Sequence, residues 1–321
     1  MSKNDALKVA VIGGGKIAQK HLEVLRDLPD AELTTMVDIN PKTLEETADQ
    51  FGIPERRRSH ADLLAGECPD AVFVLVSVLK VAEVAADFLR VGIPTFLEKP
   101  PGLYTAQTRE LADLARSHST PAMVGVNRRF YSSLLRGREA LLASGPIRSV
   151  TVEAHEDVQL VRENHKFPDE VLRRWSAANG IHALDLLRYF GGEVSEIQAT
   201  HVAVEGPMPD CSSALIQFEN GASGRALMDW FAPGRHRVEA RGVGIAFSAL
   251  VDGEAILCRR GEKPQVVAHD EIDLRYKTGF YRQDRTFLEW VRNGGDLPFP
   301  GCTLDDAVKT MELIDAISGN R

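Results

Sequence analysis

Short apolar segments alternate with longer amphipathic segments along the first part of the chain. Runs rich in β-branched residues indicate strands at about 8–13, 32–38, 71–77, 94–97 and 122–126. Between them, the spacing of apolar residues predicts helices at about 16–28, 41–51, 81–91 and 104–117. Strands that alternate with helices are typical of a doubly wound parallel sheet, so residues 1–127 are expected to form an α/β domain of the Rossmann type.

The pattern changes after Asn127. A helix is predicted at about 131–143, then strands at about 149–154, 214–219 and 224–230, and two closing helices at about 281–293 and 303–318. The pairs Asn220-Gly221 and Asp252-Gly253 indicate hairpin turns. Strands joined only by turns favour antiparallel pairing. Residues 128–321 are therefore expected to form an α+β domain with a large, mostly antiparallel open sheet.

Composition narrows the class of protein. The chain is 44% hydrophobic and 26% charged, which is typical of soluble globular proteins. With 38 basic and 46 acidic residues the net charge is −8, so nucleic acid is not an expected partner. No apolar run is long enough to span a bilayer, and the first residues lack an apolar signal region. We expect a cytoplasmic protein without a membrane partner.

The cysteines argue against metal and disulfide chemistry. Cys68, Cys211, Cys258 and Cys302 lie far apart, without a Cys-x-x-Cys pair or nearby paired histidines. We expect ordinary thiols and no metal site.

A glycine turn follows the first predicted strand directly and opens the first predicted helix. Gly13 permits a tight turn, Gly15 lets the backbone approach a pyrophosphate, and the small Ala18 lets helix and strand pack closely. The helix N-terminus at Lys16 and Ile17 offers backbone N–H groups to phosphates. This context predicts a dinucleotide site; the alternative is a glycine turn that binds no ligand.

Asp38 ends the second predicted strand, 25 residues beyond Gly13. An acid at this place is suited to bind the hydroxyls of the adenosine ribose, and it repels a 2′-phosphate. The residues that follow include no arginine to receive such a phosphate, so NAD is preferred to NADP. The alternative for Asp38 is an acid that favours the start of the next helix.

Three further strings stand at ordered positions: Glu98-Lys99-Pro100, Gly125-Val-Asn-Arg-Arg-Phe130 and Asn179-Gly-Ile-His-Ala-Leu-Asp185. With them, the chain resembles the glucose–fructose oxidoreductase and inositol dehydrogenase (Gfo/Idh/MocA) family over essentially its whole length. The resemblance implies an NAD-dependent oxidoreductase that transfers a hydride to or from a CH–OH or C=O carbon of a sugar, cyclitol or related polyol. It also implies a homo-oligomer, a dimer or tetramer.

The resemblance places Lys99 beside the nicotinamide and the reacting carbon. Hydride transfer needs a group that moves the hydroxyl proton, and an amine near a cationic nicotinamide is suited to that role because its pKa is lowered. Glu98 is expected to orient Lys99 or to contact the nicotinamide ribose, and the Lys99–Pro100 peptide is expected to be cis. The alternative is a surface lysine at a strand end.

His182 and Asp185 are three residues apart on a predicted helix, so both are expected to face one cleft. By the resemblance, His182 contacts the substrate hydroxyl and shares the proton transfer with Lys99. The alternatives are a core histidine, and an aspartate that binds backbone across a domain interface.

Further residues complete the expected site. Ser77 and Asn127 are expected to contact the cofactor. Candidate substrate contacts are Asn179, Arg129, Trp175 and His155, and less specifically Arg162, His165, Lys166 and Arg174. Trp175 and Tyr281 are candidate platforms for a sugar ring, with core packing as the alternative.

Two departures from the family pattern matter. Ala178 stands where many members have an aspartate four residues before the histidine, and residues 77–81 lack the usual proline turn and histidine. Two other hypotheses stay open. The resemblance includes relatives that cleave glycosidic bonds with internal recycling of NAD, and the missing acid at Ala178 supports a non-catalytic NAD or sugar sensor.

Overall fold

The computed structural model describes residues 6–164, 167–205, 209–251 and 253–319. The chain divides into two compact units, and each is treated by itself. The first unit comprises the chain up to Asn127 and residues 272–308; the second comprises residues 128–271 and the chain from Lys309. The boundaries fall inside three elements: the 3₁₀ helix Asn127–Phe130, α11 (Glu271–Arg275) and α13 (Leu304–Ser318).

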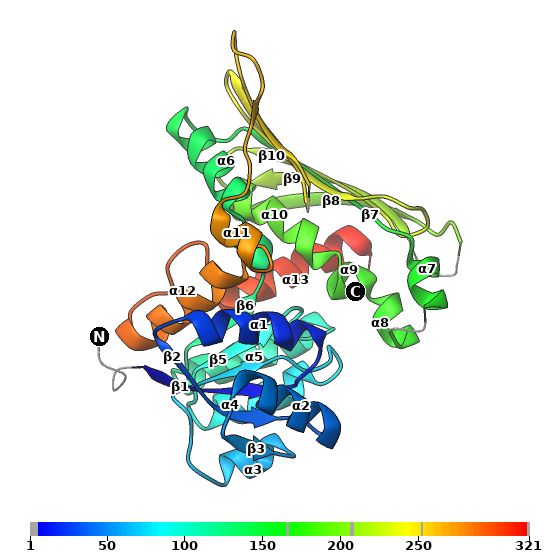
Figure 1. Ribbon diagram of the computed structural model, residues 1–321. Coiled ribbons are helices and arrows are strands. Elements are labelled where there is room, and N and C mark those ends of the chain that lie inside the picture. The colour runs from blue at the N-terminus through cyan, green and yellow to red at the C-terminus, as the bar shows by residue number, and fades with distance from the viewer. Residues whose placement is uncertain (1–5, 165–166, 206–208, 252, 320–321) are drawn as a thin grey trace. The chain divides into compact units, whose positions relative to one another are not determined.

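A parallel sheet organises the first unit, with the strand order β3-β2-β1-β4-β5-β6 in the part of the chain described (Figure 1). The strands are β1 (Leu7–Ile12), β2 (Ala31–Val37), β3 (Glu55–Arg57), β4 (Ala71–Val74), β5 (Thr95–Glu98) and β6 (Ala122–Gly125). Its helices include α1 (Lys16–Asp27), α2 (Pro41–Phe51), α3 (His60–Leu64), α4 (Val81–Arg90), α5 (Thr105–Ser117) and α12 (Phe280–Asn293). The predicted Rossmann fold is confirmed.

Local chemistry explains where these helices begin and end. The Asn40 side chain accepts hydrogen bonds from the N–H groups of Lys42 (3.0 Å) and Thr43 (3.3 Å), and Pro41 occupies the first turn of α2. Gly52 closes the helix in the left-handed region, at φ 65°. Each of these signals lies within a few residues of the helix end, so the sequence alone placed α2.

Residues 272–308 belong with the first unit, whereas the sequence-based division placed them in the second domain. The reason is the apolar face of α12, which packs against α1 (Figure 1). The Phe287 ring meets the rings of Phe73 and Phe96 edge-on, at centroid distances of 5.4 and 5.7 Å. Amphipathic periodicity shows that a helix is buried, but it does not show against which sheet.

An eight-stranded sheet, as far as the described residues show, organises the second unit in the order β14-β13-β12-β11-β7-β10-β9-β8. Its strands are β7 (Ser149–His155), β8 (Val194–Val202), β9 (Cys211–Phe218), β10 (Ser223–Asp229), β11 (His236–Gly242), β12 (Ile245–Leu250), β13 (Ala255–Arg259) and β14 (Gln265–Val266). β7 pairs with β10 in parallel, and the other neighbouring strands of this sheet pair antiparallel. This confirms the mostly antiparallel sheet.

Two helices of the second unit, α6 (Ser132–Ala143) and α10 (Ile181–Gly191), contact this sheet. Three shorter helices, α7 (Val158–Glu163), α8 (Asp169–Arg173) and α9 (Trp175–Ala178), precede α10 in the chain. In Figure 1, α6 and α10 lie along the sheet, where α10 contacts β7, β10 and β11. The hairpin at Asn220-Gly221 joins β9 to β10 as predicted, with Gly221 at φ 81°. Asp252, of the second predicted turn, lies outside the described residues.

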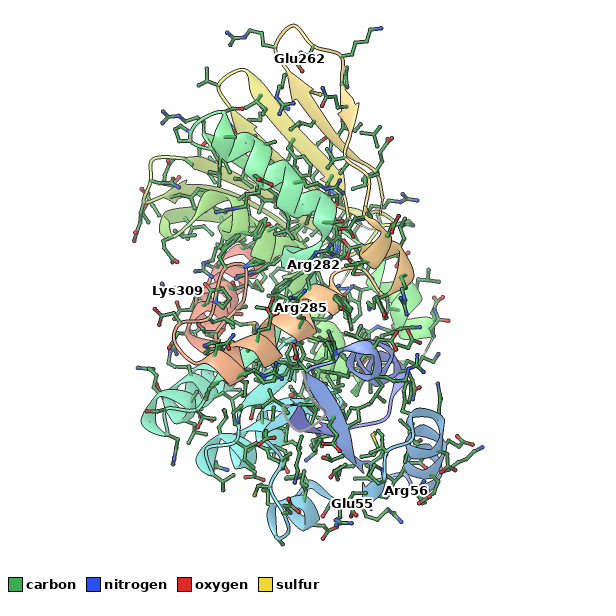
Figure 2. The ribbon with its side chains drawn as sticks, turned by 60° about the vertical axis from the view of Figure 1, so that its left-hand side comes forward. Glu55, Arg56, Glu262, Arg282, Arg285 and Lys309 are labelled. Carbon is green, nitrogen blue, oxygen red and sulfur yellow. The ribbon has the colours of Figure 1, made fainter. Side chains whose placement is uncertain are left out.

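β3 and α3 were not among the predicted elements. β3 is a short edge strand with the sequence Glu-Arg-Arg, so it shows no apolar alternation. Glu55 and Arg56 lie at the outer edge of the first unit (Figure 2), where Arg56 pairs with Glu45 and Asp49 of α2. Charged side chains protect such an edge from pairing with another chain, and they also hide the strand from a hydrophobic pattern.

Within the described residues, no helix is both long and apolar enough to cross a membrane.

Candidate functional site

The carboxyl edge of the parallel sheet gathers the predicted cofactor residues of the first unit. The glycine turn follows β1, Asp38 follows β2, Ser77 lies in the loop after β4, and Glu98 ends β5. The strand order reverses between β1 and β4, because β2 and β3 extend to one side and β5 and β6 to the other. Ligands of open α/β sheets bind in the crevice outside such a switch point.

The glycine turn is shaped by close contacts. Gly13 has φ 100°, and a Cβ there would lie 2.6 Å from the Leu75 carbonyl oxygen. A Cβ at Gly15 would meet no atom within 4 Å, so the turn is open on that side. Gly15 is the N-cap of α1, without a side-chain cap, and the first turn of α1 carries no acid. The first N–H groups of α1, at Lys16 and Ile17, therefore fit an anion such as a pyrophosphate.

Asp38 is fixed by backbone donors. Gly14 N–H donates to Oδ2 and Asn40 N–H donates to Oδ1, both at 2.7 Å. The carboxylate is half-buried, and each oxygen keeps a second lone pair for a ribose hydroxyl. Asp38 thus joins the glycine turn to the end of β2, which supports a ribose-binding role.

Ser77 and Asn127, two other residues predicted to contact the cofactor, differ in their exposure to solvent. Ser77 is exposed, and its carbonyl oxygen accepts the N–H groups of Lys80 (2.8 Å) and Val81 (3.0 Å) at the start of α4. Asn127 is buried, and its Nδ2 donates to the Thr278 carbonyl oxygen at 3.0 Å. The Asn127 amide therefore holds the chain before α12, a role that the sequence did not indicate.

Glu98 lies in a buried polar chain. Its Oε2 accepts the Lys99 N–H at 3.1 Å, and its Oε1 lies 3.3 Å from Nε2 of His21 in α1. The other ring nitrogen of His21, Nδ1, lies 2.8 Å from Asp284 Oδ2 in α12. His21 and Asp284 are fully buried, whereas Lys99 is half-buried. The Lys99–Pro100 peptide bond is cis, as expected.

His21 carries a positive charge in this arrangement. Both ring nitrogens face carboxyl oxygens, and a doubly protonated ring can donate to both of them. Burial alone lowers the pKa of His21, but the charge and hydrogen bond of Asp284, together with Glu98, outweigh burial and raise it to about 9. The result is an imidazolium between two carboxylates.

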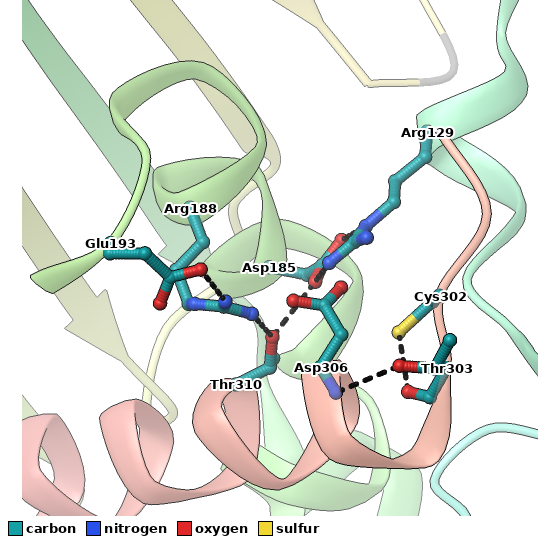
Figure 3. Close-up of polar contacts among 8 residues, drawn as sticks. All are labelled: Arg129, Asp185, Arg188, Glu193, Cys302, Thr303, Asp306 and Thr310. Carbon is teal, nitrogen blue, oxygen red and sulfur yellow. Dashed lines mark hydrogen bonds and ion pairs between the residues drawn. The ribbon is translucent and has the colours of Figure 1, made fainter. Parts of the chain in front are cut away.

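In the second unit, Asp185 and Arg129 form a buried ion pair (Figure 3). Arg129 donates from Nε to Oδ2 at 2.7 Å and from Nη2 to Oδ1 at 2.6 Å. Thr310 Oγ1 also donates to Oδ1, at 3.0 Å, and Arg188 links Thr310 to Glu193. Asp185 is 2% exposed and Arg129 5%. The catalytic role of Asp185 and the substrate role of Arg129 stay predictions, and in the described structure each of these residues satisfies the charge of the other.

Glu156 directly follows β7 and collects two of the predicted substrate residues. Trp175 Nε1 and Asn179 Nδ2 both donate to Glu156 Oε2, at 2.7 and 2.8 Å. Trp175 is 5% exposed, so it packs in the core and does not form an open platform. Asn179 and Glu156 are half-buried.

His182 lies in the first turn of α10 and is half-buried. Its backbone N–H donates to the carbonyl oxygen of Asn179 at 3.2 Å. His182 therefore lies one turn after Asn179, the residue whose side chain donates to Glu156. A fully buried core histidine, the alternative considered from the sequence, does not fit this exposure.

The remaining candidates pair with acids of their own unit. His155 Nδ1 lies 2.9 Å from Asp229, Arg162 binds Asp169 at 2.5 Å, and Arg174 binds Asp315 at 2.6 Å. Tyr281 stacks on Tyr276 at 5.2 Å. His165 and Lys166 lie outside the described residues. In the described ranges, no three His, Cys, Asp or Glu side chains form a group that could hold a metal ion.

Sequence reasoning missed His21, Asp284 and Glu156. His21 lies on the apolar face of a predicted helix, and its partner Asp284 is 263 residues away. Glu156 carried one weak signal, because it comes directly after a predicted strand.

Comparisons with known proteins agree over both units. The model of an oxidoreductase family with an NAD-binding Rossmann fold matches residues 7–126, and the model of the GFO/IDH/MocA C-terminal domain matches residues 142–245. A D-apiose dehydrogenase from Paraburkholderia graminis is 24% identical, over 96% of this chain and 86% of the relative. A myo-inositol 2-dehydrogenase from Thermotoga maritima is also 24% identical, over 90% and 89%.

A solved structure shows the same fold. The crystal structure of a Gfo/Idh/MocA family oxidoreductase from Vibrio cholerae is 26% identical and superposes with a TM-score of 0.80, over 98% of this chain and 97% of that one.

Proposed function

Since the chain belongs to the Gfo/Idh/MocA family of NAD-binding oxidoreductases, we propose that it transfers a hydride between NAD and a CH–OH or C=O carbon of a sugar, cyclitol or related polyol. The relatives described above are dehydrogenases of apiose and of inositol, which are compounds of this class.

One observation carries the proposal. The open glycine turn, Asp38 and the Glu98-Lys99 pair all lie at the carboxyl edge of one parallel sheet, after β1, β2 and β5. Asp38 at one end supports binding of the adenosine ribose, and the turn with the start of α1 supports binding of the pyrophosphate. Lys99, on the other side of the switch point, is then on the side of the nicotinamide. The carboxylate of Asp38 supports NAD over NADP.

Bound NAD would accept or donate the hydride at its nicotinamide ring. In this mechanism Lys99 moves the proton of the substrate hydroxyl, and Glu98 holds the backbone N–H of Lys99 in place. His182 contacts the same hydroxyl and shares the proton. Its half-buried position at the start of α10 supports that role.

Glu156 compensates for the missing acid at Ala178. Its carboxylate comes from the end of β7 and reaches Asn179, three residues before His182, at 2.8 Å. Trp175 and Asn179 both bind Oε2, so a lone pair on Oε1 is suited to accept from a substrate hydroxyl. In this proposal Glu156 orients the hydroxyl that Lys99 and His182 act on.

A homo-oligomer is part of the proposal. The strand faces of β9 and β10 that carry Leu215 (60% exposed) and Leu227 (43% exposed) remain open to solvent in the isolated chain. Exposed polar residues of the same strands, Ser213, Gln217 and Arg225, accompany these leucines, and a second copy on this mixed face would bury Leu215 and Leu227. Light scattering of the purified protein measures the assembly.

The experiment is a turnover assay of the purified protein with NAD over a panel of sugars and cyclitols, read by NADH absorbance. We expect turnover of at least one compound, and Lys99→Ala should reduce kcat by roughly 10²-fold or more because it removes the proton-transfer group. NADH binding should persist in that variant. Lys80→Ala, which removes an exposed lysine paired with Glu83, is the matched control.

The outcomes separate the hypotheses. Equal turnover by Lys99→Ala and the wild type would overturn the mechanism. Release of an aglycone without net NADH would favour glycosidic cleavage, and binding without turnover of any compound would favour a sensor.

A further inference from the structure

Three buried titratable residues connect α1, β5 and α12 of the first unit. His21 is 0% exposed, Asp284 is 0% and Glu98 is 8%. Moving charges from water into the core costs free energy unless the charges are paired with good geometry, so three buried charged groups in one chain suggest a specific role. The surroundings of His21 are apolar: its ring centroid lies 4.4 Å from that of Phe280, 5.2 Å from that of Phe96 and 5.8 Å from that of Phe73.

We propose that the buried pair of His21 and Asp284 is a positioning device that clamps the Glu98 carboxylate and, through it, Lys99. This inference rests on the proposed role of Lys99.

The geometry gives each residue one task. Asp284 holds Nδ1 of the ring, which aims Nε2 at Glu98 Oε1. Oε1 is thereby fixed, and Oε2 receives the N–H of Lys99 at 3.1 Å. Gln283 Nε2 lies 3.4 Å from the remaining oxygen of Asp284. The side chain of Glu98 is therefore held from both oxygens, and the turn that carries Lys99 is held with it.

A proton relay is the competing interpretation, and burial argues against it. A relay from the active site must end at water, but His21 and Asp284 are both 0% exposed. The chain of hydrogen bonds therefore ends inside the core of the first unit. Its effects are position and charge: the imidazolium balances the Glu98 carboxylate, which would otherwise stabilise the ammonium form of Lys99.

The charged groups that face His21 come from two elements. They are Glu98 at the end of β5 and Asp284 on α12, and the other ring contacts described are aromatic. Asp284→Asn replaces one carboxylate partner of the ring by a neutral amide, so the pKa of His21 should fall because its main stabilising charge is removed. Glu98→Gln instead removes the carboxylate next to Lys99 and leaves the ion pair of His21 and Asp284 in place.

The test measures the reactivity of Lys99 without any substrate. Full-length protein is acylated with acetic anhydride across a pH series, and the labelled Lys99 peptide is quantified by mass spectrometry. In Asp284→Asn the pH midpoint of Lys99 acylation should rise by roughly one pH unit, and in Glu98→Gln this midpoint should fall by a similar amount. With an identified substrate, Asp284→Asn should also lower kcat about tenfold or more, with the Kd for NADH within about twofold of the wild type.

The matched control is Asp273→Asn, which removes another buried carboxylate of the same chain segment. Asp273 is 5% exposed and binds Arg282 at 2.9 Å and the Gly279 N–H at 3.0 Å. The Asp273→Asn variant should leave the pH midpoint of Lys99 acylation unchanged. If Asp284→Asn does not fold, His21→Gln carries the test: it removes the charged ring between Asp284 and Glu98, so the pH midpoint of Lys99 acylation should rise in the same direction.

Unchanged Lys99 midpoints in folded Asp284→Asn and Glu98→Gln would overturn the inference. A shifted midpoint in a protein that turns over no polyol would support the clamp and count against the proposed function. Normal turnover together with unshifted midpoints would reject the clamp alone.

Discussion

Pairing decides which polar side chains stay available for chemistry. The sequence predicts a ribose-binding role for Asp38 and a catalytic role for Asp185, and the surroundings of the two acids differ. Asp38 is half-buried and is held by two backbone N–H groups, which leave it free to bind a hydroxyl. Asp185 is closed in by Arg129 and Thr310. An exposed lone pair, and not the residue type, distinguishes the candidate from the structural acid.

Asp38→Asn should change the choice of cofactor. The amide still accepts a hydrogen bond, but it no longer repels a 2′-phosphate. We expect the ratio of the Kd for NADPH to the Kd for NADH to fall by about tenfold or more. Repulsion between a carboxylate and a phosphate in contact costs roughly 1–2 kcal/mol, and the substitution removes it. Fluorescence titration measures both constants. An unchanged ratio would mean that Asp38 does not face the adenosine ribose.

Glu156→Gln should lower turnover and spare cofactor binding. The amide keeps the size of the side chain but loses the charge that orients a substrate hydroxyl, so kcat should fall roughly 10- to 100-fold. The Kd for NADH should not change. Glu163→Gln, at the exposed end of α7, is the control, and a loss of NADH binding in Glu156→Gln would count against a substrate role.

Ion pairs also join elements. Arg129 lies in the 3₁₀ helix Asn127–Phe130, and Asp185 lies on α10. Their two hydrogen bonds therefore connect the start of the second unit to α10. Thr310, on α13, adds a third element to the same carboxylate. A network of this kind specifies how the helices pack, because each member leaves a buried charge if its partner is removed.

Removal of one partner should destabilise the protein far more than removal of both. Arg129→Met or Asp185→Leu alone should lower the free energy of unfolding by about 3–5 kcal/mol, because each leaves an unpaired buried charge. The double variant should lose much less than the sum. Urea denaturation measures all three, and additive losses would contradict this account.

The exposed pair Arg162 and Asp169 is the control for that cycle, with side-chain exposures of 46% and 64%. Arg162→Ala should change the free energy of unfolding by no more than about 1 kcal/mol, because solvent screens the pair.

The stability of the whole molecule should depend on pH through His21. Its pKa is raised from 6.5 to about 9 in the folded state, so the folded state holds this proton more tightly than the unfolded chain. The stabilisation is complete below pH 6.5 and is lost as the pH rises to about 9, a change of the order of 3 kcal/mol.

Urea denaturation followed by circular dichroism at about pH 6, 7.5 and 9 tests this dependence. The wild type should lose stability over that range, and Asp284→Asn should show a flatter profile. Equal slopes in the two proteins would show that His21 does not hold an extra proton in the folded state.

Local signals in the sequence determined the glycine turn, the helix caps, the alternation of strands and helices along the chain, and the change of pattern after Asn127. These features depend on residues within one or two turns of each other, so their chemistry can be read along the chain. Gly13 and Gly15 belong to this group, and Asp38 is joined to them by the pairing of β1 with β2.

Only the tertiary structure decided the partners of the charged residues. His21 meets an acid 263 residues away, Arg129 closes around Asp185, and Glu156 reaches Asn179 from another element. The attachment of α12 to the first unit belongs to the same group. Periodicity shows that a face is buried, but the identity of the surface that buries it is set by long-range packing, and packing determines which charges meet.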